Sequence, residues 1–249
     1  MLWHKAWMDT RWRFLIGLGV LTCSALAVVL GYSYVQEILA ANSKGPLAAE
    51  ISSVAQLSNT FRGYIWVQFI RQNLLQLWTV FAVLFGAEGL ISQRRGALFM
   101  LSLPVSRGRL CAVRAATDLA ELCVLALIPM LLISLVAPAA GHSYALADAA
   151  VHGFGIFAGG AVFYCLALLL ATSFRDRWRP IVLSLAAAVM VYLGLRLMPA
   201  LGPFGPVSVM AGDTYFRTGT PAWAALSAWL ACSAAMLYLA VRNVVARDY

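Results

Sequence analysis

Charged residues are scarce in this chain. Only 11% of its 249 residues are Asp, Glu, Lys or Arg, whereas 62% are hydrophobic. An average soluble domain has roughly a quarter of its residues charged. So much apolar surface has to face lipid, which excludes a soluble domain and predicts a polytopic membrane protein. The net charge of +8 could indicate nucleic-acid binding, but the arginines lie in short segments between apolar runs, so no nucleic-acid partner is expected.

Lysine is rarer still, with Lys5 and Lys44 the only two in the chain. No G-x-x-x-x-G-K-[ST] segment is present, so no P-loop can hold a nucleotide. No H-E-x-x-H or paired Cys/His spacing predicts a metal site, and no Ser–His pattern predicts a nucleophile with its base. We interpret the five single cysteines as small buried hydrophobic residues, not as ligands or disulfides. No catalytic, cofactor or metal site is therefore expected.

Six apolar runs are long enough for a helix of about 20 residues, which crosses a hydrocarbon core. These runs are 14–34, 74–92, 115–137, 149–171, 181–197 and 222–241. Thirteen of the 18 lysines and arginines fall on one side of them, and the positive side stays in the cytoplasm. We predict an all-α fold, one domain over residues 1–249, with six transmembrane helices and both termini inside. In the fourth run, Gly155-x-x-x-Gly159 predicts close helix packing.

The segments outside these runs are also informative. Residues 1–13 place tryptophans on one face and charges on another, which predicts an interfacial helix leading into the first crossing. A cleaved signal peptide is the alternative, but the apolar run is long for one, which favours an uncleaved anchor. Residues 36–73 are expected to form the largest extracytoplasmic segment. Within it, the aromatic, amphipathic residues 64–72 predict either an interfacial helix or an outward extension of the second crossing. The last outer loop, 198–221, is too rich in Gly and Pro for a long helix.

Three acidic residues lie within or beside the apolar runs. Asp118 and Glu121 are in the first turns of the third run, and Glu88 is near the inner end of the second. A charge at the bilayer centre costs about 3 kcal/mol on insertion scales, so such acids are candidates for an ion or proton path. Arg114 lies four residues before Asp118, and all three acids lie in the cytoplasmic third. Structural pairing is therefore the favoured interpretation.

The most basic part of the chain is 88–114, between the second and third runs. It holds five arginines, yet its centre at 97–103 (ALFMLSL) is almost wholly apolar. Pro104 disfavours a helical conformation at the residue before it, so a short helix in this segment has to end there. Ser106 can then cap the third crossing. This pattern predicts a cytoplasmic surface that docks onto another protein; the alternative is a helical connection packed against its own bundle.

The loop resembles that of the type-2 permeases of ATP-binding-cassette (ABC) exporters, which typically reads E-x-x-x-G-T-L … L-P-V-S-R. The residues that match are Gly96, Leu98, Leu103, Pro104, Val105, Ser106 and Arg107. Ala97 replaces the usual Thr, and Gln93 stands where a Glu is common. The motif covers only this loop, whereas the predicted topology extends the resemblance over the whole chain.

The resemblance implies that residues 93–106 carry a coupling helix, which contacts a separate ATPase subunit. The contact residues it implies are Gly96, Leu98, Phe99, Leu101, Pro104 and Arg107. That partner would bind ATP and Mg²⁺, and a second copy of this chain or a homologous permease would complete an export pathway in a bacterial inner membrane. A pathway lined by apolar and aromatic side chains favours amphipathic or lipid-like cargo. The alternative is a secondary transporter or channel that uses Asp118 and Glu121, although no inverted repeat is evident.

Overall fold

The computed structural model describes residues 2–42, 57–88, 106–174, 176, 178–197 and 199–246, and every regular element in these ranges is a helix. The longer helices are α1 (Leu2–Leu30), α7 (Arg107–Val136), α8 (Leu146–Ser173), α9 (Trp178–Leu197) and α12 (Trp223–Ala246). The shorter ones are α2 (Tyr32–Asn42), α4 (Phe61–Tyr64), the π-helix η1 (Ile65–Leu74), α5 (Leu75–Ala87), η2 (Ala137–Ala140), η3 (Pro199–Phe204), α10 (Pro206–Ala211) and α11 (Asp213–Thr218). The all-α prediction is confirmed for this part of the chain.

Within the described ranges, four helical stretches are long and apolar enough to cross a membrane. They are Leu2–Leu30, Gly108–Ala140, Leu146–Ser173 and Trp223–Ala246, and they contain most of the predicted first, third, fourth and sixth runs. The predicted fifth run is helical too, but its apolar part, Trp178–Gly194, is shorter. The predicted second run begins at the end of η1, continues through α5 and extends into residues outside the described ranges. Four long apolar helices indicate a membrane protein, while the number six stays a prediction.

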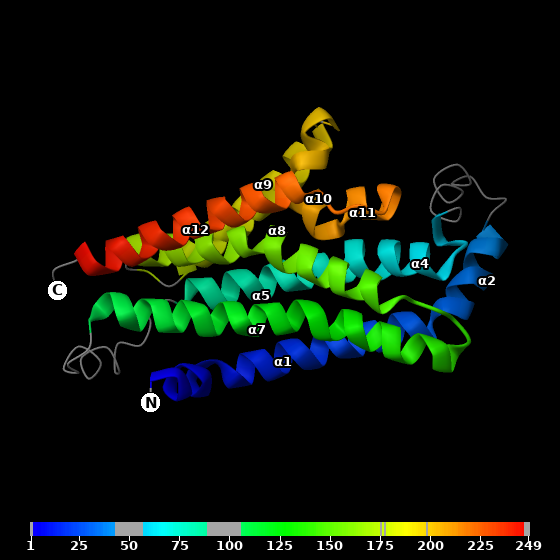
Figure 1. Cartoon of the computed structure of the whole chain (residues 1–249), viewed down its shortest axis with the longest axis horizontal. Coiled ribbons are helices and arrows are strands. Elements are labelled where there is room, and N and C mark those ends of the chain that lie inside the picture. The colour runs from blue at the N-terminus through cyan, green and yellow to red at the C-terminus, as the bar shows by residue number, and fades with distance from the viewer. Residues whose placement is uncertain are drawn as a thin grey trace.

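The helices form an elongated bundle in which α8 is central. It packs against α12, α5, α7 and α10, and α1 lies along α7 (Figure 1). The start of α1 and the end of α12 lie at one end of the bundle, where α5 also ends and α7 begins (Figure 1, left). We call this the N-terminal end; α2, α4 and α11 lie towards the opposite, far end. The described helix ends that flank the segment predicted to be a cytoplasmic loop, at Ala87 and Arg107, therefore lie at the N-terminal end.

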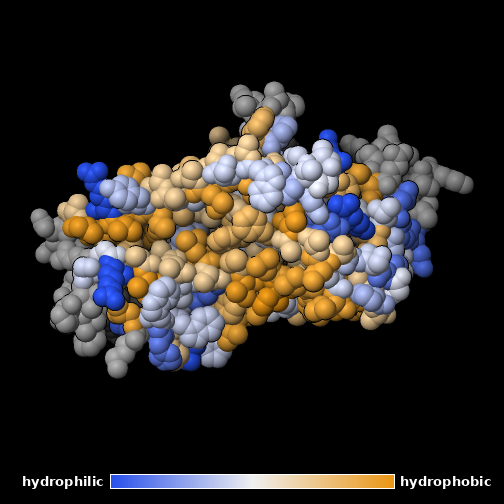
Figure 2. Space-filling model, viewed as in Figure 1, coloured by the Kyte–Doolittle hydropathy of each residue, from blue (hydrophilic) through white to orange (hydrophobic). Residues whose placement is uncertain are grey.

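Helix α1 runs without interruption from Leu2 to Leu30, so the predicted interfacial segment and the start of the first crossing lie in one helix. Its buried residues recur every three or four positions, which defines one narrow stripe: Thr10, Phe14, Gly17, Leu21, Ala25 and Val29. Beyond Phe14, the other faces are mainly apolar and exposed, with Ile16 60% and Leu30 73% accessible. Figure 2 shows apolar residues across the middle of the bundle and hydrophilic ones gathered towards its ends. This distribution suits a helix bundle in a bilayer.

The π-helix η1 links α4 to α5 without a break, so residues 64–72 are continuous with the helix of the predicted second crossing; that they extend it outward stays a prediction. A π-helix bonds each residue to the fifth one along, so side chains five apart lie one above the other. The Arg71 guanidinium accordingly lies 4.8 Å from the centre of the Trp66 ring. The Asn73 side-chain amide donates to the Gln68 carbonyl at 2.8 Å. Such helices are rare and frequently occur at functional sites.

The glycines of α8 allow close packing at the centre of the bundle. A Cβ atom on Gly160 would lie 2.2 Å from the Trp78 ring of α5, and one on Gly159 would lie 3.0 Å from the Met210 side chain of α10. Trp78 is held in place because its indole N–H donates to the Leu122 carbonyl at 3.0 Å. The Gly-x-x-x-Gly spacing thus brings α8 against α10 and leaves room beside it for the indole of α5.

Candidate functional site

Most of the residues implied for the ATPase contact lie outside the described residues: Gly96, Leu98, Phe99, Leu101 and Pro104. Arg107 is the first residue of α7. Ser106 precedes it as the helix cap, and its hydroxyl oxygen accepts a hydrogen bond from the Arg109 backbone N–H at 3.4 Å. The predicted cap is therefore present, and α7 begins about two turns before the apolar run at 115–137.

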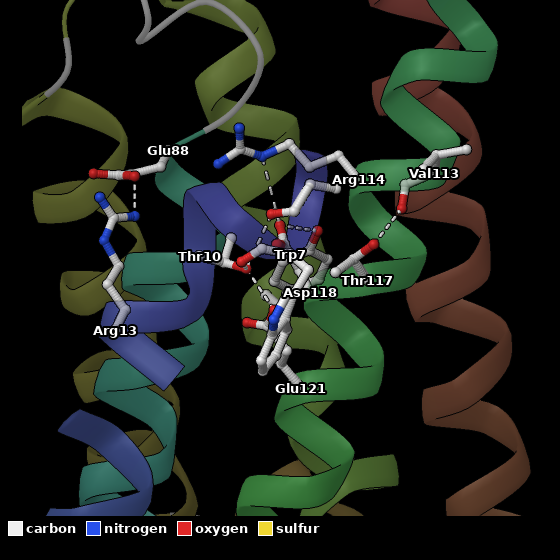
Figure 3. A network of polar contacts seen from close by, with 11 residues as sticks. Trp7, Thr10, Arg13, Glu88, Val113, Arg114, Thr117, Asp118 and Glu121 are labelled. Carbon is white, nitrogen blue, oxygen red and sulfur yellow. Dashed lines mark hydrogen bonds and ion pairs between the residues drawn. The ribbon is translucent and has the colours of Figure 1, made fainter. Parts of the chain in front are cut away.

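The four charged residues singled out from the sequence lie near one another, three of them on α7 and one directly after α5 (Figure 3). Arg114 Nε is 3.9 Å from Asp118 Oδ2, one turn along α7, and both side chains are buried. Glu121 lies one turn further, and Glu88 directly follows α5. Arg114 thus faces the acid with which the sequence pattern paired it.

Three further residues complete this arrangement, and they come from α1 and α8. The Thr10 hydroxyl donates to the Glu121 carboxylate, and Arg13 forms an ion pair with Glu88 (Figure 3). From α8, the Tyr164 hydroxyl donates to Asp118 Oδ2 at 3.1 Å. We call the seven residues the N-terminal polar cluster: Thr10, Arg13, Glu88, Arg114, Asp118, Glu121 and Tyr164. Their interactions tie α1, the end of α5, α7 and α8 together.

Several buried polar atoms of the cluster have no hydrogen-bond partner among the described residues, among them the donor Arg114 Nε. Asp118 Oδ1 and Glu121 Oε2 are both buried and have no hydrogen-bond partner among the described residues. Burying a carboxylate is costly unless a cation or donors compensate, and Arg13 and Arg114 supply the positive charge. A neighbouring cavity of about 30 Å³, lined partly by Arg114, has room for no more than a few waters. The arrangement can hold helices in register or respond to protonation. Across the described ranges, no group of three or more His, Cys, Asp and Glu side chains could bind a metal.

A second polar cluster lies at the far end. Arg62 of α4 pairs with Asp148 near the start of α8, with Nε 3.2 Å from Oδ2. The Tyr215 hydroxyl of α11 donates to the other oxygen of the same carboxylate at 2.7 Å. This hydrogen bond raises the pKa of Tyr215 above its usual value, because the carboxylate favours the protonated phenol. The three residues join α4, α8 and α11.

Aromatic rings continue this cluster along η1. Trp66 stacks on Phe216 with ring centres 4.3 Å apart, and its indole N–H donates to the Ala211 carbonyl at 2.9 Å. The Arg71 guanidinium lies over the Trp66 ring, and its Nη2 is 3.4 Å from Asp213 Oδ2. Burial raises the pKa of the Asp213 carboxyl, against the opposing effect of Arg71 and Arg217. We call the set the far-end cluster: Arg62, Trp66, Arg71, Asp148, Asp213, Tyr215 and Phe216.

The sequence argument missed Thr10, Arg13 and Tyr164 as partners, and it missed the far-end cluster. Thr10 and Glu121 are 111 positions apart, so no local spacing links them. One signal was available, because Thr10 is a polar residue at an apolar position of the amphipathic first segment. Arg62 and Arg71 were counted only as charges of an outer segment, whereas both lie close to aromatic rings.

A comparison with protein-family models, with curated proteins and with solved structures finds no match for this chain. Its function therefore has to be argued from its residues and their geometry.

Proposed function

We propose that this chain is the permease subunit of an ABC exporter, driven by ATP hydrolysis in a separate subunit. The observation that carries the proposal is the L-P-V-S-R segment at 103–107, which ends a basic loop with an apolar centre directly before α7. In this arrangement six crossings place both termini in the cytoplasm. Two such chains, or this chain and a homologous one, enclose the substrate pathway in the cell membrane. ATP and Mg²⁺ are bound by the partner, because this sequence has no P-loop.

The N-terminal polar cluster supports this proposal by its position. Glu88 is the last described residue before the loop, and Arg13 binds it to α1. On the other side of the loop, Asp118 and Glu121 lie about three and four turns from the start of α7. Through these contacts, a displacement of the loop acts on α1, α7 and α8 together. In this proposal, the cluster links an ATPase docked on the loop to the helices that line a pathway.

The deciding experiment changes the apolar centre of the loop. Leu98→Asp or Leu101→Asp puts a carboxylate into a desolvated contact, where an unpaired charge costs several kcal/mol, enough to break a modest interface. Ser102→Asp is the matched control, with the same new charge at a polar position of the same loop. We expect both leucine variants to reach the membrane normally but to lose co-purification with, and stimulation of, a P-loop ATPase.

Full ATPase coupling in the leucine variants would show that the loop packs against its own bundle. ATP hydrolysis by the purified chain alone would also contradict the proposal. Arg107→Ala should have a milder effect, since ion pairs at the rim of an interface contribute little.

The second candidate function is a secondary transporter or channel, favoured by the buried carboxylate oxygens of Asp118 and Glu121 that lack partners. Asp118→Asn and Glu121→Gln separate the two candidates. If these acids carry protons or ions, each substitution abolishes transport driven by an ion gradient. In a permease they alter stability, while the ATPase partner remains bound.

A further inference from the structure

A groove at the far end lies beside Arg71 and Asp213. Its first part, which we call the polar part, is a cavity of about 410 Å³ whose wall combines apolar residues with the polar residues Arg71, Gln72, Gln76, Tyr192, Ser208 and Asp213. A second cavity of about 280 Å³ has a mainly apolar wall, which includes Val80, Phe163, Leu185 and Val189. Four residues line both cavities, so these are two parts of one groove: Leu75, Gln76, Tyr192 and Val207.

The two parts follow one another along the same helices. The polar part begins beside Arg71 in η1, and the apolar part extends to Val80, about two turns further along α5. Because η1 lies towards the far end and α5 runs back towards the N-terminal end (Figure 1), the groove changes from polar to apolar towards the middle of the bundle. A bilayer changes in the same order, from headgroups to hydrocarbon. The shape and polarity of the groove thus suit an amphiphile.

The polar part offers one cation and one anion. Arg71 Nη2 and Asp213 Oδ2 are 3.4 Å apart, and their side chains are 49% and 22% exposed. An ion pair that is this open contributes little to stability, so a ligand can compete for it. Asp213 Oδ1 is buried and accepts no hydrogen bond from the described residues. Rotation about the broad terminal torsion of Asp can exchange its two oxygens, so a ligand N–H donor would complete the carboxylate.

We propose that this groove binds an amphiphile whose head carries a phosphate and a primary ammonium group, as phosphatidylethanolamine does. The phosphate binds the Arg71 guanidinium, whose planar set of N–H donors matches phosphate oxygens. The ammonium donates to Asp213, and an acyl chain fills the apolar part between α5 and α9. The inference that this lipid is a cargo rests on the proposed function. The binding of the lipid in the groove does not require an ATPase.

The test uses the full chain purified in detergent and titrated with short-chain lipids that share acyl chains. Phosphatidylethanolamine should bind about tenfold tighter than phosphatidylcholine, which has no N–H donor, or phosphatidylglycerol, which has no cation. Arg71→Gln and Asp213→Asn should each weaken phosphatidylethanolamine binding about tenfold, and Asp213→Asn should remove the preference over phosphatidylcholine. Arg179→Gln and Asp176→Asn, from an exposed pair outside the groove, are the matched controls and should change nothing.

Ala188→Trp provides an independent test, because the indole fills the apolar part of the groove and the charges of Arg71 and Asp213 stay in place. It should weaken the binding of all three lipids. Equal affinity for the three lipids, or unchanged binding in Ala188→Trp, would overturn the inference. Dissociation of a dimer by Ala188→Trp, without a change in lipid affinity, would assign the groove to a second copy of this chain. If the chain prefers phosphatidylethanolamine but stimulates no ATPase, only the permease proposal is rejected. If it stimulates an ATPase but binds the three lipids equally, only the proposed lipid site in the groove is rejected.

Discussion

The N-terminal polar cluster and the far-end cluster both pair arginines with carboxylates, yet they differ in burial and in what surrounds them. In the N-terminal polar cluster, Arg114 and Asp118 are 10% and 2% exposed, although Arg13 and Glu88 are 36% and 14% exposed, and the adjoining cavity holds about 30 Å³. At the far end, Arg62 and Arg71 are 40% and 49% exposed, and the adjoining cavity holds about 410 Å³. Electrostatic interactions strengthen as water is excluded. The first cluster is therefore suited to hold helices together, and the second is suited to exchange partners with a ligand.

The substitution with the largest expected effect is Arg114→Gln. It leaves Asp118 buried beside Tyr164 without its nearest cation, and breaking a buried ion pair in this way costs about 3–5 kcal/mol. We expect a clear fall in the thermal unfolding midpoint in detergent. Arg179→Gln, which breaks an exposed pair, is the control and should change stability by less than about 1 kcal/mol.

A double substitution sharpens this test. Arg114→Met with Asp118→Leu replaces both charges by apolar side chains of similar size, which is often neutral for a buried pair. The double variant should recover most of the stability that Arg114→Gln loses. A double variant as unstable as the single one would show that the loss does not come from an uncompensated Asp118 charge.

Thr10→Val should have the next largest effect. It keeps the shape of the side chain but removes the donor to Glu121, whose other oxygen already lacks a partner. Leaving a buried acceptor unsatisfied costs about 1–3 kcal/mol. Thr10→Ser keeps the hydroxyl and should remain within about 1 kcal/mol of the unsubstituted chain, as judged by the same thermal midpoint. Equal losses in both variants would point to packing of the methyl group instead.

Arg114 and Thr10 also show how much of the candidate site could be predicted from the sequence. The Arg114–Asp118 pair could be predicted because residues four apart on a helix are neighbours. The Ser106 cap could be predicted because serine is a favoured cap and stands directly before the start of the third helix. The bond between Thr10 and Glu121 depends on how α1 packs against α7, which no spacing within either helix reveals. In the same way, the apolar runs predict helices but not the type of helix. The π-helix, in which each backbone hydrogen bond joins residues five apart, places Arg71 over Trp66, and the runs do not predict it. The candidate groove depends on α5, α9, α10 and α11 together, so it could not be predicted from any one segment.

At the far end, Tyr215→Phe should have a smaller effect than the changes at Arg114 and Thr10. It removes the hydroxyl that donates to Asp148 at 2.7 Å, but the carboxylate keeps Arg62 as a partner. We expect a loss of about 0.5–1.5 kcal/mol, the net worth of an ordinary hydrogen bond. A loss as large as that of Arg114→Gln would mean that the far-end cluster is as dependent on its charges as the buried one, and the contrast between the two would fail.

The smallest expected effect is that of Arg71→Lys. Lysine keeps the positive charge near Asp213, but it lacks the planar group that lies over the Trp66 ring at 4.8 Å. A cation–π contact at an exposed site is worth about 0.5–1 kcal/mol, so the thermal midpoint should fall only slightly. High salt should reduce the stability contribution of the Arg71–Asp213 pair, since exposed charges are screened, and should leave the effect of Arg114→Gln nearly unchanged. A salt response of equal size at both ends would show that water reaches the N-terminal polar cluster as freely as the far end.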